Sequence, residues 1–254
     1  MKGKSIVITG GANGLGLATA WMAVERGARV ALIDKDETAL AHAVATMTAK
    51  GHEALALPGD VSSRDACTEL FGAAVQAFVR VDGLANCAGI YPRVPLLEIS
   101  EEDWYLSFMV NVLGVHYMMA AAVTHMRAQE SGSEQTGGEV ARGRIVNVTS
   151  VDAHIANPKN AHYAATKAAV ASLTKSFALE FAPAQIMINA VAPAAIVTER
   201  AKATGWMLQH ETETPLGRAA KPEDIADVIL FLLSSRNRYM TGENMIASGA
   251  FTMV

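Results

Sequence analysis

Tyr163 and Lys167 are the two side chains whose types and spacing most directly suggest proton chemistry. They stand four residues apart in a segment whose apolar residues recur at a helical period, so both polar ends lie on one helical face. An ammonium in that position would favour the phenolate over the phenol and lower a pKa that starts at about 10. Such a tyrosine could transfer a proton near neutral pH. A Tyr–Lys pair on a solvated helix has the same spacing and is the alternative.

Ser150 supplies a hydroxyl that could share a site with this pair. It follows the β-rich run from Arg144 to Thr149, and ligands of open parallel sheets bind in the crevice beyond the carboxyl ends of the strands. A hydroxyl at that point suits a substrate oxygen. By itself, a serine after a strand is more often a turn residue.

A glycine-rich turn near the start of the chain indicates a second kind of chemistry, the binding of a pyrophosphate. The turn runs Thr9-Gly10-Gly11-Ala12-Asn13-Gly14-Leu15-Gly16 between a predicted strand and a predicted helix. Glycines at positions 10, 14 and 16 allow a tight turn and leave room for phosphate against the N–H groups of the helix start. The alternative is a helix start without a ligand, but the strand before, the helix after and an acidic residue at the next strand end favour a dinucleotide.

Asp34 is that acidic residue. It follows the apolar run Arg29–Ile33, where a carboxylate can accept hydrogen bonds from the adenosine ribose of NAD. The alternative is an ordinary acidic residue near a helix start. The neighbouring Lys35 can turn into solvent and need not neutralise the carboxylate. We therefore expect NAD(H) as the cofactor.

The elements that must position these residues alternate between β-rich runs and helical patterns, which is typical of βαβ units around a parallel sheet. The predicted strands are Ser5–Thr9, Arg29–Ile33, Ala54–Leu57, Gly83–Asn86, Arg144–Thr149, Met187–Val191 and Asn244–Ala247. The predicted helices are Gly14–Arg26, Glu37–Lys50, Arg64–Val79, Glu102–Arg127, His162–Ala182 and Glu223–Leu233. We expect an α/β fold: one Rossmann-like domain over residues 1–254, with a doubly wound parallel sheet of about seven strands between two helical layers.

Composition excludes several classes of protein. The 254 residues are 51% hydrophobic and 18% charged, a balance that can bury a large core. The net charge of −4 and the lack of a long basic run argue against a nucleic-acid partner. Two widely separated cysteines, Cys67 and Cys87, fit neither a metal site nor a disulfide framework. We expect no metal and a reducing, cytoplasmic location.

Two stretches need separate interpretation. Trp104–Met126 carries no formal charge and is long enough to span a bilayer. It contains Asn111, His116 and His125, which are costly in lipid, so we expect a covered core helix and no membrane partner. Gln129–Gly143 is crowded with Ser, Gly, Glu and Gln and predicts a solvated loop, with a functional lid as the alternative.

Taken together, these motifs resemble the short-chain dehydrogenase/reductase family over essentially the whole chain. The matches are Thr9-Gly10-x-x-x-Gly14-x-Gly16, Asp60-Val61, Asn86-Cys87-Ala88-Gly89, Asn111, Ser150, Tyr163-x-x-x-Lys167, Asn189-x-Val191-x-Pro193, Pro215-Leu216-Gly217-Arg218, Pro222-Glu223-Asp224 and Thr241-Gly242-Glu243. The resemblance implies a nicotinamide cofactor, a homo-oligomer (dimer or tetramer) and a catalytic tetrad of Asn111, Ser150, Tyr163 and Lys167.

The resemblance also implies roles for individual residues. Asp60 would meet the adenine, Ile196 would offer backbone to the nicotinamide, and Thr198 would contact the pyrophosphate or carboxamide. Lys167 would also bind the nicotinamide ribose, and Asn111 would hold a water that links Lys167 to solvent, unless it is a satisfied core asparagine. The full cofactor set implied is Gly10, Asn13, Gly14, Leu15, Gly16, Asp34, Asp60, Val61, Asn86, Ala88, Gly89, Tyr163, Lys167, Pro193, Ile196 and Thr198.

Three positions depart from the family pattern. Cys87 replaces an asparagine, Ala194 replaces the glycine that usually follows Pro193, and Ala247-Ser248-Gly249 stands where Val-Asp-Gly-Gly is common. The methyl group of Ala194 restricts φ and occupies space beside the expected nicotinamide pocket. None of the three departures removes a tetrad residue.

We expect an NAD(H)-dependent oxidoreductase that interconverts a secondary alcohol and a ketone, with Tyr163 as proton donor or acceptor. Two alternatives stay open: a 3-oxoacyl-thioester reductase of the acyl-carrier-protein type, and a dinucleotide-binding regulator or scaffold without turnover. The substrate itself is not identified. Tyr91-Pro92-Arg93, Val151–Asn157 and Glu199–Thr214 are the expected pocket walls, where Arg93 and His154 are either substrate contacts or solvated loop residues.

Overall fold

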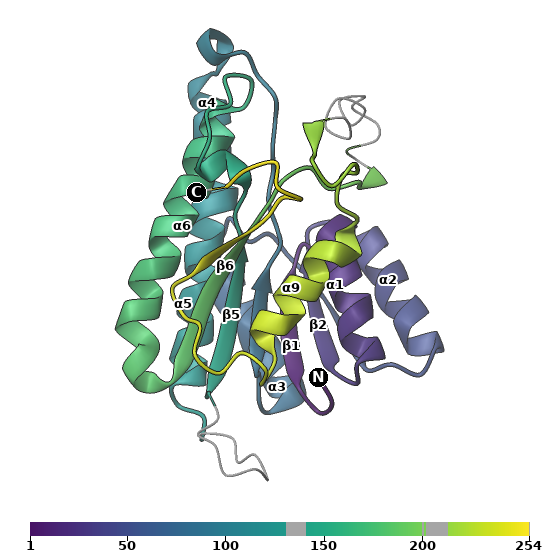
Figure 1. The fold of residues 1–254 in the computed structure, drawn as a ribbon. Coiled ribbons are helices and arrows are strands. Elements are labelled where there is room, and N and C mark those ends of the chain that lie inside the picture. The colour runs from purple at the N-terminus through teal and green to yellow at the C-terminus, as the bar shows by residue number, and fades with distance from the viewer. Residues whose placement is uncertain (131–140, 200, 202–212, 254) are drawn as a thin grey trace.

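Seven parallel strands form one sheet with helices on both of its faces (Figure 1). This computed structural model describes residues 1–130, 141–199, 201 and 213–253. The strand order is β3-β2-β1-β4-β5-β6-β7. The strands are β1 Ser5–Thr9, β2 Arg29–Asp34, β3 Ala54–Pro58, β4 Gly83–Asn86, β5 Gly143–Val148, β6 Ile186–Pro193 and β7 Asn244–Ala247.

The helices form a layer on each side of the sheet. On one side are α1 (Gly14–Glu25), α2 (Glu37–Ala49) and α9 (Pro222–Leu233); on the other are α3 (Arg64–Phe78), α5 (Gly114–Met126) and α6 (Ala161–Phe181) (Figure 1). The shorter elements are η1 (Leu96–Glu98), α4 (Glu101–Phe108), the π-helix η2 (Met109–Leu113), η3 (Val151–Ala153) and η4 (Ala182–Ala184). These layers confirm the predicted three-layer, doubly wound architecture.

The strands are apolar throughout because both faces of the sheet are covered. In β1, Ile6 and Ile8 belong to the core beneath α1 and α9, while Val7 belongs to the core beneath α3, α5 and α6. Successive side chains of a strand point to opposite faces, so a continuous apolar run feeds both cores. In β2, Leu32 and Ile33 divide between the two cores in the same way.

One helix was predicted as continuous but is interrupted in the structure. The run expected as a single helix over Glu102–Arg127 is α4, the π turn η2 and then α5. α4 begins one residue earlier than predicted because Ser100 and Asp103 form a capping box. The composite run Glu101–Met126 is long and apolar enough to cross a membrane, with a mean hydropathy of 1.6, and half of its most apolar window is buried in the protein. Packing against α3, α6 and the sheet accounts for that composition.

The chain reverses its strand order between β1 and β4, which places a crevice at the carboxyl ends of the central strands. β1 pairs with both β2 and β4, and Thr9, Asn86 and Asn147 lie in register across β1, β4 and β5. Ser150 follows β5 at this edge. The topology therefore gathers the predicted site residues where open α/β sheets bind their ligands.

Asp82 ties the opposite, amino-terminal edge of the sheet together. Its Oδ2 accepts a hydrogen bond from Ser5 N at 3.0 Å, and its Oδ1 lies 2.7 Å from Arg80 Nε and 3.2 Å from Lys4 Nζ. Burial alone would raise the pKa of Asp82, but the hydrogen bonds from Arg80 and Ser5 and the nearby positive charges outweigh it and hold the pKa below the ordinary 3.8.

We predict that Asp82→Asn lowers the free energy of unfolding by about 2 kcal/mol at pH 7, because a buried charge cluster loses one partner. Asp227→Asn, which breaks only the exposed pair with Arg26, should cost less than about 0.5 kcal/mol. The folded-state pKa of Asp82 lies below the unfolded one, so its stabilisation is complete above about pH 4 and is lost as the pH falls through the folded value. Denaturant titrations across this range should show the Asp82→Asn deficit shrinking; a constant deficit would contradict the assignment.

Candidate active site

Ser150 and Tyr163 come together beyond the carboxyl end of β5. Ser150 caps η3, with its Oγ accepting a hydrogen bond from Asp152 N at 3.1 Å. Tyr163 lies in the first turn of α6, near enough to Ser150 that the Ser150 side chain lowers the pKa of its hydroxyl. The two predicted hydroxyls are therefore neighbours, and both can contact a single substrate oxygen.

Lys167 lies one helical turn further along α6, and its ammonium is buried. Nζ donates to Val148 O at 2.7 Å and lies 5.5 Å from the centroid of the Tyr163 ring. Burial lowers the pKa of Lys167 to about 8, and the nearby Cys87 acts in the opposite direction. At neutral pH the group is mostly protonated, so the site holds one positive charge beneath the tyrosine.

The pKa of Tyr163 corrects the simplest expectation from spacing. Burial raises it above the ordinary 10, and the hydrogen bond from Ser150 opposes that rise only in part. The charges of Asp152 and Tyr91 raise it further. In the chain without cofactor, desolvation of the phenolate therefore outweighs the stabilisation expected from Lys167.

Asn111 occupies the middle of the π turn and is completely buried. Its Oδ1 accepts from Ile90 N at 2.8 Å, and its Nδ2 donates to Ile90 O at 2.8 Å and to Thr166 Oγ1 at 3.1 Å. None of the three bonding partners lies in α4 or α5. Asn111 therefore connects the π turn to the segment after β4 and to α6. Such single-turn π-bulges are frequent at functional sites.

Gly89 provides the space in which these groups face each other. A Cβ at this position would lie 3.2 Å from Asn111 Oδ1 and 3.6 Å from Lys167 Nζ. Asn111 and Lys167 thus approach the same small volume from different elements. This is the juxtaposition that a water relay would require, although Asn111 is also a well-satisfied core asparagine.

The glycine-rich turn forms a cradle that side chains would fill. Gly10 has φ +66°, and a Cβ there would lie 2.9 Å from the Ala88 backbone; a Cβ on Gly16 would lie 2.1 Å from Gly10 O. Asn13 caps α1 without a side-chain hydrogen bond, and the first turn carries no acidic residue. The helix start therefore presents backbone N–H groups without a competing carboxylate, which fits the pyrophosphate of a dinucleotide.

Asp34 ends β2 beside this cradle and helps to shape it. Its Oδ2 accepts from Ala12 N at 3.1 Å, and its Oδ1 accepts from Asp36 N at 3.1 Å. Each carboxylate oxygen has a further acceptor position. The same side chain can therefore order the turn and still accept hydrogen bonds from a ribose.

The remaining predicted cofactor residues line the same edge of the sheet or support it. Ala88 N donates to Thr9 Oγ1 at 3.1 Å, and a Cβ on Gly14 would contact Thr198 Cγ2 at 3.5 Å. Three others form hydrogen bonds within the protein: Asn86 Nδ2 donates to Asn147 Oδ1, Asp60 Oδ1 accepts from Ser62 N, and Leu15 O accepts from Thr19 Oγ1. The last three have packing or backbone roles: Val61 packs against Gly114, Pro193 ends β6, and Ile196 forms a β-bridge with Ala220.

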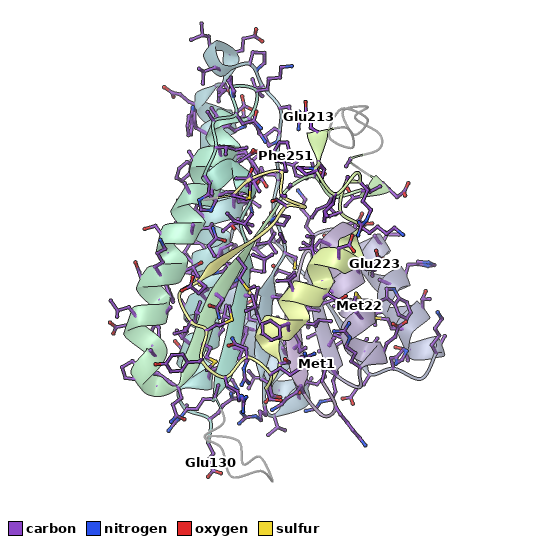
Figure 2. All side chains as sticks on the ribbon, in the orientation of Figure 1. Met1, Met22, Glu130, Glu213, Glu223 and Phe251 are labelled. Atoms are coloured by element: carbon purple, nitrogen blue, oxygen red, sulfur yellow. The ribbon has the colours of Figure 1, made fainter. Side chains whose placement is uncertain are left out.

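Residues after β7 return to the site end of the molecule. Figure 2 shows Phe251 and Glu213 there, and Leu216 N donates to Gly249 O at 3.3 Å, so the two segments are in contact. They enclose a cavity of about 520 Å³ that Ala194 also lines. Expected wall residues 200 and 202–212, and residues 131–140 of the expected loop, lie outside the described residues. No cluster of metal-ligating side chains occurs within the described ranges.

Sequence reasoning missed two contributors to the site and assigned no individual role to a third. Val148 contributes only a carbonyl oxygen, and Thr166, whose hydroxyl meets Asn111, has no distinguishing motif. Asp152 carries a charge close enough to act on Tyr163. It lies within the expected pocket wall Val151–Asn157, but the sequence alone did not single it out.

Several known proteins are similar to this chain over nearly its whole length. Residues 10–252 match a family model described as enoyl-(acyl carrier protein) reductase. The 3-oxoacyl-[acyl-carrier-protein] reductase FabG of Thermotoga maritima is 37% identical over 257 residues, covering 96% of this chain and 95% of the relative. L-rhamnose 1-dehydrogenase (NAD(P)(+)) of a Sphingomonas species is 34% identical over 254 residues, covering 98% and 96%. The crystal structure of a short-chain type dehydrogenase/reductase from Mycobacterium marinum superposes with a TM-score of 0.89 at 31% identity, covering 99% of this chain and 96% of that one.

We predict that Lys167→Met moves the rising limb of the oxidation rate to higher pH and reduces the rate at neutral pH, because the phenolate of Tyr163 loses a nearby positive charge. The pH dependence of kcat/KM measures this. Lys167→Arg keeps the charge and should move the limb less. Lys175→Met, at an exposed position of α6, is the matched control. A Lys167→Met profile with the wild-type shape would show that the ammonium does not act on the tyrosine.

Proposed function

The chain belongs to the short-chain dehydrogenase/reductase family and is an oxidoreductase that interconverts alcohols and ketones with a nicotinamide dinucleotide; we propose that Tyr163 moves the proton and that the dinucleotide is NAD(H). The observation that carries this proposal is the proximity of Ser150 and Tyr163 to each other and to the buried Lys167 ammonium. When bound, the dinucleotide accepts or supplies the hydride.

Ser150 and Tyr163 would share the substrate oxygen between them. During oxidation the Tyr163 oxygen takes the proton from the carbinol O–H, and during reduction it returns a proton to the carbonyl oxygen. Ser150 donates a hydrogen bond that keeps the oxygen in place and favours the phenolate, as its effect on the Tyr163 pKa indicates. Burial raises the pKa of Tyr163 above its ordinary value, which favours the protonated phenol that reduction requires.

Lys167 and Asn111 would support that proton transfer from below. Protonated Lys167 supplies the charge that makes the phenolate less costly, and its bond to Val148 O fixes the distance from Tyr163. Asn111 holds the backbone of Ile90 on one side and Thr166 on the other. We propose that a water above Gly89 joins Asn111 to Lys167 and carries the proton onward.

NAD(H) is proposed over NADP(H) because of Asp34. Its carboxylate lies at the end of β2, within hydrogen-bond reach of the glycine-rich turn. A ribose 2′-phosphate there would face a negative charge, at a cost on the order of 4 kcal/mol for a 4 Å separation at an effective dielectric of 20. Lys35 and Arg64 are exposed near this edge and could recover part of that cost, so the preference should be smaller than the Coulomb energy implies.

The wider setting is proposed on less specific features. A homo-oligomer would cover apolar side chains that are exposed on η1 and α4: Leu96, Leu97, Trp104, Tyr105 and Leu106. A cytoplasmic location fits the two free cysteines. The net charge of −4 suits small-molecule substrates better than nucleic acid, and the partly buried α4–α5 run suits a core helix better than a membrane span.

A 3-oxoacyl-thioester reductase is the second candidate, favoured by the similarity to the Thermotoga maritima reductase. A regulator or scaffold without turnover is disfavoured because it has no need of a buried lysine beneath a paired tyrosine and serine. Oxidation of NADH with a panel of simple ketones, hydroxyketones and 3-oxoacyl thioesters separates the three. Thioester-only turnover would select the second candidate, and no turnover the third.

We predict that Tyr163→Phe reduces turnover by about 10²–10⁴-fold and leaves NADH affinity nearly unchanged, because the transferable proton is lost and the ring is kept. Single-turnover rates and NADH fluorescence titrations measure the two quantities. Ser172→Ala, at an exposed position on the same helix, is the control. Retention of more than about a tenth of the wild-type chemical rate would mean that another group moves the proton.

We predict at least about a tenfold preference for NAD(H) in kcat/KM at saturating substrate. Asp34→Asn should narrow this preference, since it removes the charge yet keeps one acceptor for the backbone of the turn. Asp36→Asn tests a neighbouring carboxylate whose partner is the start of α2. Equal use of both cofactors by the wild type, or an unchanged ratio in Asp34→Asn, would remove Asp34 from the ribose site.

A further inference from the structure

A carboxylate stands next to the two hydroxyls that hold the reacting oxygen. Asp152 follows Ser150 by two residues, and its N–H donates to Ser150 Oγ at 3.1 Å. Its negative charge also acts on Tyr163, whose pKa it helps to raise. Asp152 is therefore close to both Ser150 and Tyr163, although proton transfer between substrate and Tyr163 does not require it.

The side chain of Asp152 is held in a defined position. Its Oδ2 accepts a hydrogen bond from Asn157 Nδ2 at 3.2 Å. Val151, which precedes it in η3, is buried and anchors the turn in the core. Asp152 itself is half-buried, so its carboxylate lies in a partly desolvated setting. Hydrogen bonds to a charged acceptor are strong in such a setting.

Other hydrogen-bonding side chains surround the same opening. The Tyr91 ring meets the Tyr163 ring edge-on, with centroids 6.4 Å apart, and the charge of its phenolate form also acts on Tyr163. His154 directly follows η3; its Nε2 is 2.9 Å from Asn244 Nδ2, and Asn244 Oδ1 accepts from Thr149. The described segments around Ser150 and Tyr163 therefore carry several polar side chains.

We propose that Asp152 is a specificity-determining residue whose carboxylate accepts a hydrogen bond from a second hydroxyl on the carbon beside the reacting carbinol. The substrate class would then be small vicinal diols and the corresponding α-hydroxy ketones. One carbinol loses its hydride to NAD⁺ and its proton to Tyr163, and the second hydroxyl is unchanged. This inference rests on the proposed function and names the substrate class of that site.

Desolvation is the physical reason for the selectivity. When a diol binds, its second hydroxyl donates a hydrogen bond to the Asp152 carboxylate in place of the one that water donated. A simple alcohol instead places an apolar group against that charge. Sites built to bind a hydroxyl reject analogues that lack it much more strongly than apolar pockets reject an added one. The same negative charge disfavours anionic substrates such as hydroxy acids.

Pairs of substrates that differ by one hydroxyl test the proposal. The pairs are 2-butanol with 2,3-butanediol, cyclohexanol with 1,2-cyclohexanediol, and 1-phenylethanol with 1-phenyl-1,2-ethanediol. Wild-type kcat/KM should favour the diol by about tenfold or more in at least one pair. Equal values in all pairs would overturn the inference and leave the proposed function standing. A preference for the matching amino alcohol over the diol would also overturn it, and no turnover of any compound would overturn both.

Variants of Asp152 then test whether its carboxylate causes the preference for diols. Asp152→Ala should reduce the diol preference to about threefold or less, mainly through KM for the diol, while Asp152→Asn keeps the shape and one acceptor and should retain part of it. With the simple alcohol, both variants should move the rising limb of oxidation to lower pH, because Tyr163 loses a neighbouring negative charge. Glu180→Gln, an exposed acid near the other end of α6, should change neither quantity. Unchanged diol preference in both Asp152 variants, or an unmoved pH limb, would overturn the role assigned to this carboxylate.

Discussion

The buried ammonium of Lys167 constrains the rest of the site. Taking that charge out of water is costly unless close partners replace the hydration shell, and the described partner is Val148 O at 2.7 Å. This bond joins the first turns of α6, which carry Tyr163, to the last residue of β5, two positions before Ser150. A shift of α6 that separated the Tyr163 and Ser150 hydroxyls would also break the bond between the Lys167 ammonium and Val148 O.

The fold around this charge could be predicted from sequence because its elements are periodic. The starts of all seven strands and of the predicted long helices lie within one residue of the expected positions, and β6 runs two residues beyond its expected end. The exception is the π turn around Asn111. An asparagine that bonds to Ile90 and Thr166 demands a local register that hydrophobic periodicity cannot reveal, because the apolar pattern of Trp104–Met126 continues through the turn. The four proposed catalytic residues could be named by motif, whereas the direction of the Tyr163 pKa shift required knowledge of burial.

The two halves of the crevice differ in how they are built, and this explains which half could be predicted. The cofactor half consists largely of backbone: glycines whose Cβ atoms would collide, and helix N–H groups without a side-chain cap. Such a surface depends on a few residue types at fixed spacing, which a sequence displays. The described substrate half consists of side chains on short irregular segments, where Asp152 depends on Asn157 for its position and His154 contacts Asn244. No periodic pattern encodes those contacts.

Asp152 connects proton transfer with substrate recognition, because its carboxylate affects both the Tyr163 proton and the substrate. Its charge makes the phenolate of Tyr163 more costly, which by itself opposes removal of a proton from the substrate. A second hydroxyl on the substrate would soften that cost by donating to the carboxylate and spreading its charge. The penalty on Tyr163 would then be smallest when a matching substrate is bound, so recognition and proton transfer would be coupled through a single side chain.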